Sequence, residues 1–102
     1  MAVMKVNNDT FQEKVLNNSK PVLVDFYADW CGPCKMLASV VEQISAESDA
    51  FDVVKLNVDD APDLAARYGV MSIPTLIVFK GGEAAARSVG VQTKANILKM
   101  LG

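Results

Sequence analysis

The two cysteines of this chain, Cys31 and Cys34, are separated only by a glycine and a proline. A pair at this spacing can close a small disulfide ring or open it, and so carry two electrons to or from a partner. Two buried core thiols, or half of a zinc site shared with another chain, are the alternatives. The C-x-x-C pattern near alternating strands and helices favours the redox interpretation.

The chain contains no histidine, which excludes Ser–His and Cys–His catalysis. A tetrahedral zinc site needs about four nitrogen, sulfur or oxygen ligands, and the sequence offers only two thiols. It also lacks the glycine-rich fingerprint of a dinucleotide site. We therefore expect no metal and no bound cofactor, with the cysteine pair itself as the redox group.

The length and net charge of the chain limit the number of domains and the kinds of partner that we expect. A chain of 102 residues is the size of one domain, so we expect a single domain over residues 1–102. A net charge of −2 and a pI near 4.9 argue against binding to nucleic acid or to anionic lipid. No apolar run could span a membrane, and Met1–Asn8 lacks the apolar core of a secretory signal. These features predict an intracellular protein, or one that has lost a targeting segment.

The cysteines follow a strand and open a helix. Val22–Tyr27 is a continuous β-prone run, typical of a strand covered on both faces. A helix from Cys34, or already from Cys31, to Glu47 has its apolar residues three and four positions apart. Cys31 would then lie at the helix N-terminus, where free N–H groups and the helix dipole favour a thiolate. Cys34, one turn further on, should be the more enclosed thiol.

The rest of the chain alternates in the same way, which indicates an α/β domain. The element order is βαβαβαββα, with Gly81–Gly82 as the turn of a terminal hairpin. We predict the other strands at Met4–Val6, Asp52–Val58, Thr75–Lys80 and Ala84–Val89, and the other helices at Thr10–Asn17, at Asp63–Tyr68 and after Thr93.

Two helices carry local signals. Thr10 and Glu13 fit a capping box at the start of the first helix. Thr93 can cap the last helix. In that helix we expect Ile97, Leu98 and Leu101 to face inward.

Two charged residues interrupt apolar strands. Asp25 lies within the run of the central strand, where an unpaired carboxylate is costly, so it should be protonated or paired. The functional interpretation is a general acid/base with a raised pKa, and the alternative is a strand-edge aspartate in water. Lys55 interrupts the next strand, and from the residues alone an ordinary surface lysine is favoured.

The hexapeptide Trp30-Cys31-Gly32-Pro33-Cys34-Lys35 resembles the active-site motif of the thioredoxin family. Further segments resemble the same family in the same order, and together they cover nearly the whole chain. The resemblance implies the thioredoxin fold, a mixed sheet of about five strands flanked by four helices. The matching segments are Val24–Phe26, Lys55–Asp59, Tyr68–Val70, Ile73–Leu76, Phe79–Glu83 and Val89–Gly90.

The same resemblance implies an enzyme that reduces disulfides in partner proteins. Cys31 would attack, Cys34 would resolve the mixed disulfide, Asp25 would serve Cys34, and Lys55 would lie near Asp25. Although an X-Pro bond is usually trans, the resemblance implies a cis bond before Pro74. The docking patch for the partner would consist of Trp30, Gly32, Pro33, Ile73, Pro74, Gly90 and Val91.

Electrons would come from a separate thioredoxin reductase, linked to NADPH or ferredoxin, and the chain would act as a cytoplasmic monomer. A plastid or mitochondrial location is open if a transit segment has been removed. The alternative function is a thioredoxin-like binding or processivity subunit with dispensable thiols. The Gly-Pro pair between the cysteines resembles the active sites of reductants more than those of oxidants, which argues against an oxidase or isomerase. Ser39, where many relatives have a kinking proline, predicts a straighter helix, and Tyr27 replaces a frequent tryptophan.

Overall fold

The computed structural model describes residues 3–102, and a single five-stranded sheet runs through it. The strand order is β1-β3-β2-β4-β5, with β1, β3 and β2 parallel and β4 and β5 antiparallel to their neighbours. This confirms the predicted mixed sheet. The elements are β1 (Met4–Val6), η1 (Gln12–Leu16), β2 (Val22–Tyr27), α1 (Gly32–Glu47), β3 (Asp52–Asn57), α2 (Pro62–Arg67), β4 (Thr75–Lys80), β5 (Glu83–Val89) and α3 (Lys94–Leu101).

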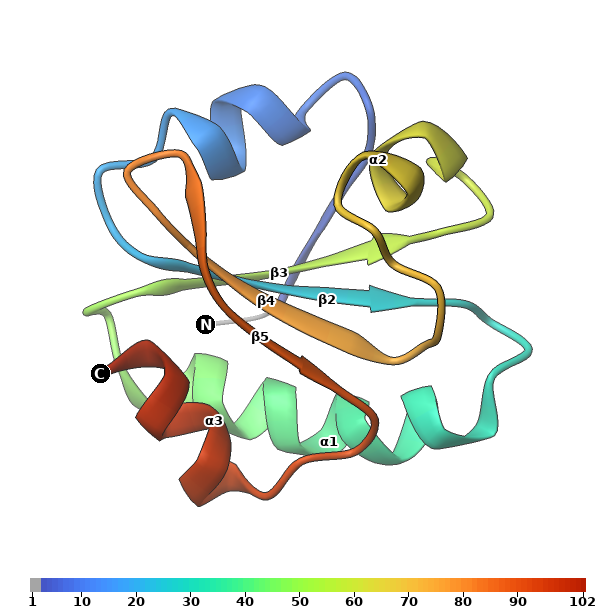
Figure 1. Cartoon of the computed structure of the whole chain (residues 1–102). Coiled ribbons are helices and arrows are strands. Elements are labelled where there is room, and N and C mark those ends of the chain that lie inside the picture. Colours follow the sequence, from blue (N-terminus) through green and yellow to red (C-terminus); the bar gives the residue numbers. More distant parts are fainter. Residues whose placement is uncertain (1–2) are drawn as a thin grey trace.

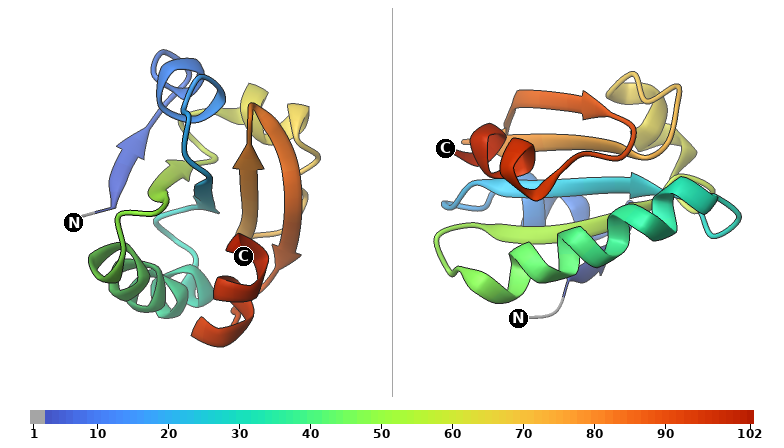
Figure 2. Two further views of the ribbon diagram at one scale, coloured as in Figure 1. Left: turned by 90° about the vertical axis from the view of Figure 1, so that its left-hand side faces the viewer. Right: turned by 90° about the horizontal axis from the view of Figure 1, so that it is seen from below.

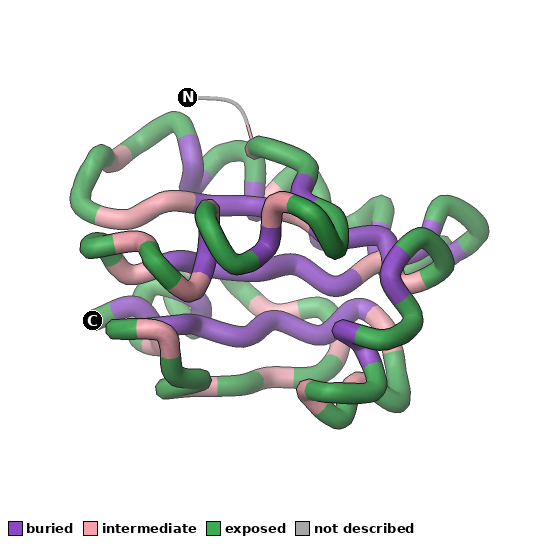
Figure 3. The backbone as a smooth tube through the Cα atoms, turned by 90° about the horizontal axis from the view of Figure 1, so that it is seen from above, coloured by how far each residue is buried: buried purple, intermediate pink, exposed green. Residues whose placement is uncertain are grey.

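Helices cover both faces of the sheet, as Figure 1 shows: η1 and α2 lie on one face, α1 and α3 on the other. Because side chains alternate along a strand, β2 contributes to both layers. Val24 and Phe26 pack with η1 and α2, whereas Leu23 packs with α1 and α3. Figure 3 shows the resulting continuous burial along the central strands.

Helix α3 begins as predicted, because Thr93 Oγ1 accepts a hydrogen bond from the N–H of Asn96. It lies beside α1 beneath the sheet (Figure 2). Its residues Ile97 and Leu101 are buried in the core layer between the sheet and these two helices. The prediction for Leu98 was wrong: its side chain is 40 % exposed, and Met100 packs inward instead. Positions 98 and 100 flank the stripe of residues 97 and 101 on opposite sides, and only the side of Met100 packs against the core.

The first helix begins differently from the prediction. Asn7 Oδ1 accepts from the N–H of Thr10, and Thr10 Oγ1 accepts from the N–H of Asn7, so the reciprocal cap lies one turn earlier than Thr10 and Glu13. The segment then forms a π-helix, with the N–H of Asn17 donating to the carbonyl of Gln12 at 2.8 Å. Val15 is nonetheless buried, as an inward-facing helix residue should be.

The β4–β5 hairpin turns at Gly81 and Gly82, which have φ values of 58° and 81° and confirm the predicted turn. A side chain at position 82 would also meet the chain: a Cβ there would lie 3.0 Å from the carbonyl oxygen of Leu16. Glycine at this position therefore lets the hairpin fit closely against the end of η1.

Candidate active site

The junction between β2 and α1 presents both cysteines. A turn closed by the N–H of Cys31 and the carbonyl of Ala28, 3.2 Å apart, leads from the end of β2 into the helix. Cys31 is the N-cap residue of α1, and its Sγ accepts from the N–H of Cys34 at 3.2 Å. The helix thus begins at Gly32, directly after Cys31 and two residues before Cys34. Free N–H groups and the helix dipole therefore point at the sulfur atom.

Cys31 and Cys34 are joined by a disulfide whose Cα atoms are 5.3 Å apart. The side chains are 4 % and 3 % exposed, so both cysteines are buried and Cys34 is the more enclosed thiol only by a small margin. Ala28, Tyr27, Val58 and Ile73 pack around the pair. Only a small part of each cysteine side chain is therefore open to a partner.

The loop before β4 faces the disulfide. The peptide bond between Ile73 and Pro74 is cis, as the family resemblance implied. The carbonyl oxygen of Ile73 lies 3.9 Å from Cys31 Sγ. Thr75 Oγ1 donates to the carbonyl of Ser72, and the N–H of Gly90 donates to the carbonyl of Pro74 at 2.8 Å. These bonds hold the backbone of residue 73 beside the sulfur atoms.

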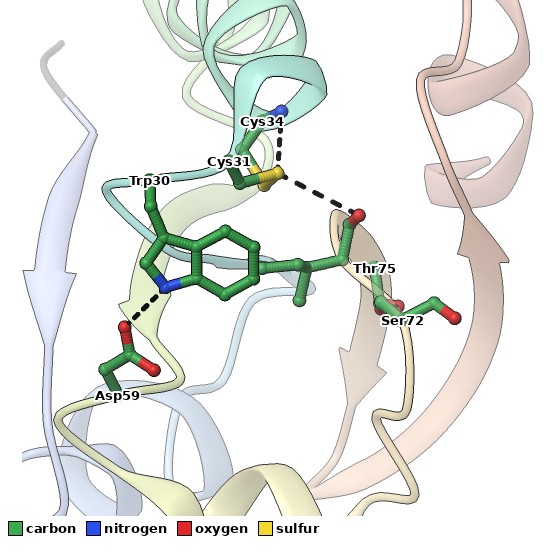
Figure 4. Close-up of a disulfide and its surroundings, with 7 residues drawn as sticks. Trp30, Cys31, Cys34, Asp59, Ser72 and Thr75 are labelled. Carbon is green, nitrogen blue, oxygen red and sulfur yellow. Dashed lines mark hydrogen bonds between the residues drawn. A yellow bond between two sulfur atoms is a disulfide. The ribbon is translucent and has the colours of Figure 1, made fainter.

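Trp30 lies on the other side of the disulfide. Its indole ring is 71 % exposed, and Nε1 donates to Asp59 Oδ2 at 2.9 Å (Figure 4). Sequence reasoning missed Asp59 as a neighbour of the site. The signal was present, because Asp59 follows β3, and the carboxyl ends of the parallel strands β2 and β3 meet at one edge of the sheet.

Asp25 is buried on the face of the sheet that α1 covers, since it alternates with Val24 and shares its face with Leu23. Its Oδ1 has no hydrogen-bond partner among the described residues. Burial raises the pKa of Asp25 from 3.8 to about 7, against the opposing charge of Lys55. The predicted raised pKa is thus confirmed, and the alternative of a strand-edge aspartate in water is wrong.

Lys55 is the register partner of Asp25 on the neighbouring parallel strand, so the two residues lie side by side. No ion pair between them occurs in the described part of the chain; Lys55 Nζ lies 5.7 Å from the centre of the Tyr27 ring. This contact places the ammonium group beside the aromatic face rather than freely in solvent. Lys55 therefore acts on Asp25 through its charge and not through a direct bond.

Exposed apolar side chains gather in the segments that adjoin the disulfide. Trp30 and Val91 of the predicted docking patch are exposed, and so are Gly32 and Pro33. Ile73 is partly buried and Pro74 is buried, so Pro74 shapes the patch from beneath rather than adding exposed area. Two exposed methionines absent from the prediction lie within two residues of Cys34 and Ile73 in the sequence: Met36 is 67 % exposed and Met71 94 %.

Gly90 has a backbone conformation that explains why a glycine occupies this position. A Cβ at this position would meet nothing within 4 Å, so no neighbouring atom of the chain requires a glycine. The backbone requires the glycine, because its φ of 90° is a conformation that residues with a side chain rarely adopt. The space over Gly90 therefore stays open towards the docking patch.

Comparison with known proteins yields one family. The family model named Thioredoxin matches residues 2–102. A thioredoxin of Streptomyces clavuligerus is 51 % identical over 94 residues, covering 92 % of this chain and 88 % of that protein. A thioredoxin of Staphylococcus epidermidis is 50 % identical over 102 residues, covering 99 % and 96 %. The M-type chloroplastic thioredoxin of Chlamydomonas reinhardtii is 50 % identical over 95 residues, covering 92 % and 68 %.

The chain belongs to the thioredoxin family. Membership confirms the predicted fold and makes the chain a thiol–disulfide oxidoreductase whose substrates are proteins that contain disulfides. The alternative of a binding subunit with dispensable thiols is not favoured.

Two other features, a metal cluster and a membrane-spanning helix, are absent from the described part of the chain. Within residues 3–102, no group of three or more histidine, cysteine, aspartate or glutamate side chains is placed to hold a metal ion. In the same part of the chain, no helix is long and apolar enough to cross a membrane.

Proposed function

We propose that the chain reduces disulfides in partner proteins, with Cys31 as the attacking thiolate and Cys34 as the resolving thiol. The observation that carries these roles is the N-cap position of Cys31, whose sulfur accepts the N–H of Cys34 and lies where helix α1 favours an anion. The N–H of Cys34 donates to Cys31 Sγ. The helix end therefore stabilises a thiolate at Cys31 in preference to one at Cys34.

The thiol–disulfide exchange takes place in two steps. The Cys31 thiolate attacks one sulfur of the partner's disulfide, forms a mixed disulfide and releases the partner's other sulfur as a thiolate. Cys34 loses its proton and attacks Cys31 Sγ, which closes the Cys31–Cys34 disulfide and releases the second partner sulfur. The partner gains two electrons, which the cysteine pair loses; Cys34 releases one proton, and the second proton of the partner dithiol comes from water.

Asp25 is proposed as the acceptor of the Cys34 proton. It lies on the sheet face beneath α1, and a pKa of about 7 means that the carboxyl group is partly ionised at neutral pH. Lys55 supports this role because its charge opposes the effect of burial on the Asp25 pKa. Together they keep the carboxyl group able to change protonation state at the working pH.

Docking is proposed to occur on the patch of Trp30, Gly32, Pro33, Ile73, Pro74, Gly90 and Val91. Exposed apolar surface in one place marks protein-interaction sites. The Ile73 carbonyl adjoins Cys31 and is available to an extended partner segment, which would pair with this backbone as a strand does. The flanking side chains of Met36 and Met71 extend the patch with flexible apolar groups.

We further propose that residues 1–102 act as one monomeric domain and that a separate thioredoxin reductase, linked to NADPH or ferredoxin, restores the dithiol. The two-electron exchange needs such a donor, because the cysteine pair ends each cycle oxidised. We assign the cytoplasm as the compartment, with a plastid or a mitochondrion as the alternatives. The chloroplastic relative supports the plastid.

Single-cysteine variants test the assignment of roles. Cys34→Ser should accumulate a mixed disulfide with a protein substrate, seen as a mass adduct that a reductant removes, because nothing resolves it. Cys31→Ser should form no adduct and show no turnover. Normal turnover by Cys34→Ser would contradict the resolving role. Activity retained by the double serine variant would restore the binding-subunit alternative.

A further inference from the structure

The charges beside the disulfide are unevenly distributed. Asp29 lies in the turn that leads from Ala28 to Cys31, Asp59 accepts the indole N–H of Trp30, and Asp60 follows directly. All three aspartates are exposed. We call Asp29, Asp59 and Asp60 the acidic rim, because they border the Trp30 side of the docking patch.

One lysine compensates the acidic rim. Lys5 Nζ lies 3.2 Å from Asp60 Oδ2, and this hydrogen-bonded pairing, with further attraction from Tyr27, Asp60 and Asp29, raises the pKa of Lys5. Among the described residues no other lysine or arginine forms an ion pair with the rim. Three carboxylates and one ammonium leave two negative charges, which equals the net charge of the whole chain.

The opposite side of the docking patch carries no charge. Residues 70–76, which include the loop beside Cys31, are all uncharged, and so are residues 88–93 around Gly90. Figure 4 shows the contrast directly, with Asp59 and Trp30 on one side of the disulfide and Ser72 and Thr75 on the other. A partner segment that crosses the cysteines therefore passes from an uncharged surface to a negative one.

We propose that this chain prefers partner disulfides flanked on one side by lysine or arginine, which the acidic rim attracts, and on the other side by uncharged or apolar residues. The proposal rests on the proposed function, since it concerns the partner that docks for exchange. Charges at the rim of an interface act mainly on encounter and orientation, so the preference appears in kcat/KM rather than in the rate of resolution. It weakens as salt screens the charges.

Matched peptides test the preference. Two peptides with the same internal disulfide and the same apolar flank differ only in two lysines or two glutamates on the other flank. At low ionic strength kcat/KM should be about three- to tenfold higher for the lysine peptide, and the ratio should approach one at about 0.5 M salt. Equal values at low salt, or a preference for glutamate, would overturn the proposal.

Charge-matched variants locate the effect. Asp29→Asn/Asp60→Asn and Glu42→Gln/Glu83→Gln both change the net charge from −2 to 0, but only the first pair lies in the acidic rim. The ratio between the two peptides should collapse towards one in the rim variant and persist in the control. A ratio that falls equally in both would refer the effect to net charge and overturn the proposal.

An uncharged small disulfide separates this proposal from the proposed function. If the wild-type chain reduces this compound and both peptides, but without preference, the exchange chemistry stands and the selectivity fails. If it reduces none of them although the cysteines are in the dithiol form, the proposed function itself fails.

Discussion

At the scale of single residues, the site depends on an acidic group placed where water does not reach it. Asp25 is 4 % exposed, and one of its oxygens has no partner among the described residues. Such a group destabilises the fold whenever it is charged. The pKa of about 7 that suits proton exchange with Cys34 therefore has a cost in stability above neutral pH.

The sign of the pH dependence follows from that pKa. Between pH 4 and 7 the native chain holds the Asp25 proton and the unfolded chain has released it, so stability falls as pH rises through this window. The full loss above pH 7 is at most about 4 kcal/mol. Asp25→Ala should therefore be about 2–4 kcal/mol more stable than wild type at pH 8, with little difference at pH 4.

Urea unfolding of the oxidised protein at both pH values measures this, with Asp49→Ala as an exposed control. A variant that is less stable than wild type at both pH values would place Asp25 in a structural network. The same substitution should lengthen the lifetime of the mixed disulfide, because Cys34 loses its proton acceptor. Single-turnover kinetics of the resolving step would show that effect.

Site residues could be predicted where the evidence for them lies in neighbouring residues of the sequence, and were missed where it depends on contacts between distant segments. Asp25 was predicted because a carboxylate inside an apolar strand is visible in six neighbouring residues. Asp59 was missed because its bond to Trp30 spans 29 residues of sequence. Pro74 was placed on the surface because nothing in its sequence neighbourhood shows that it is buried.

At the scale of elements, the strands and most boundaries could be predicted because hydrophobic periodicity and turn residues act locally. The start of the first helix could not, since its cap pairs Asn7 with Thr10, and threonine in the second position is not the usual capping-box signal. The π-helical form of Gln12–Leu16 was not predicted either. Ser39 lies within the uninterrupted helix α1, and the straighter axis stays a prediction.

Helix α3 provides a matched pair for its corrected face. Ile97→Ala should reduce the free energy of unfolding by about 2–5 kcal/mol, because it empties a fully buried position between the helix and the sheet. Leu98→Ala should change it by less than about 1 kcal/mol, since the side chain is 40 % exposed. Chemical denaturation measures both, and a larger cost at Leu98 would contradict the assigned face.

The β4–β5 hairpin gives a second comparison. Gly81→Ala and Gly82→Ala both place a side chain at positive φ, which costs about 1–2 kcal/mol. Only at position 82 does the new Cβ also meet backbone, at 3.0 Å from the Leu16 carbonyl oxygen. Thermal unfolding should therefore show the larger loss for Gly82→Ala. Equal losses would mean that the end of η1 yields without cost.

At the scale of the whole molecule, one sheet separates two cores and belongs to both. Neighbouring residues of β2 and of β4, such as Leu76 and Ile77, face opposite layers. Loss of either layer therefore exposes the strands of the other, and we expect one cooperative unfolding transition.

Far-UV circular dichroism and native-state hydrogen exchange test this expectation. Val15→Ala in one layer and Ile97→Ala in the other should each shift the whole transition without splitting it. In exchange experiments, the most protected amides of β2 and β4 should lose protection together in both variants. Selective loss in one layer would show that the two cores unfold independently.

The position of Trp30 has an optical consequence. It is the only tryptophan of the chain, its ring is exposed, and it stands in the docking patch next to the disulfide. Disulfides quench indole fluorescence at short range, and covering the ring with a partner shifts its emission to shorter wavelength. The fluorescence intensity of Trp30 in the unlabelled protein should therefore follow the redox state of the disulfide, and its emission wavelength should follow occupancy of the docking patch.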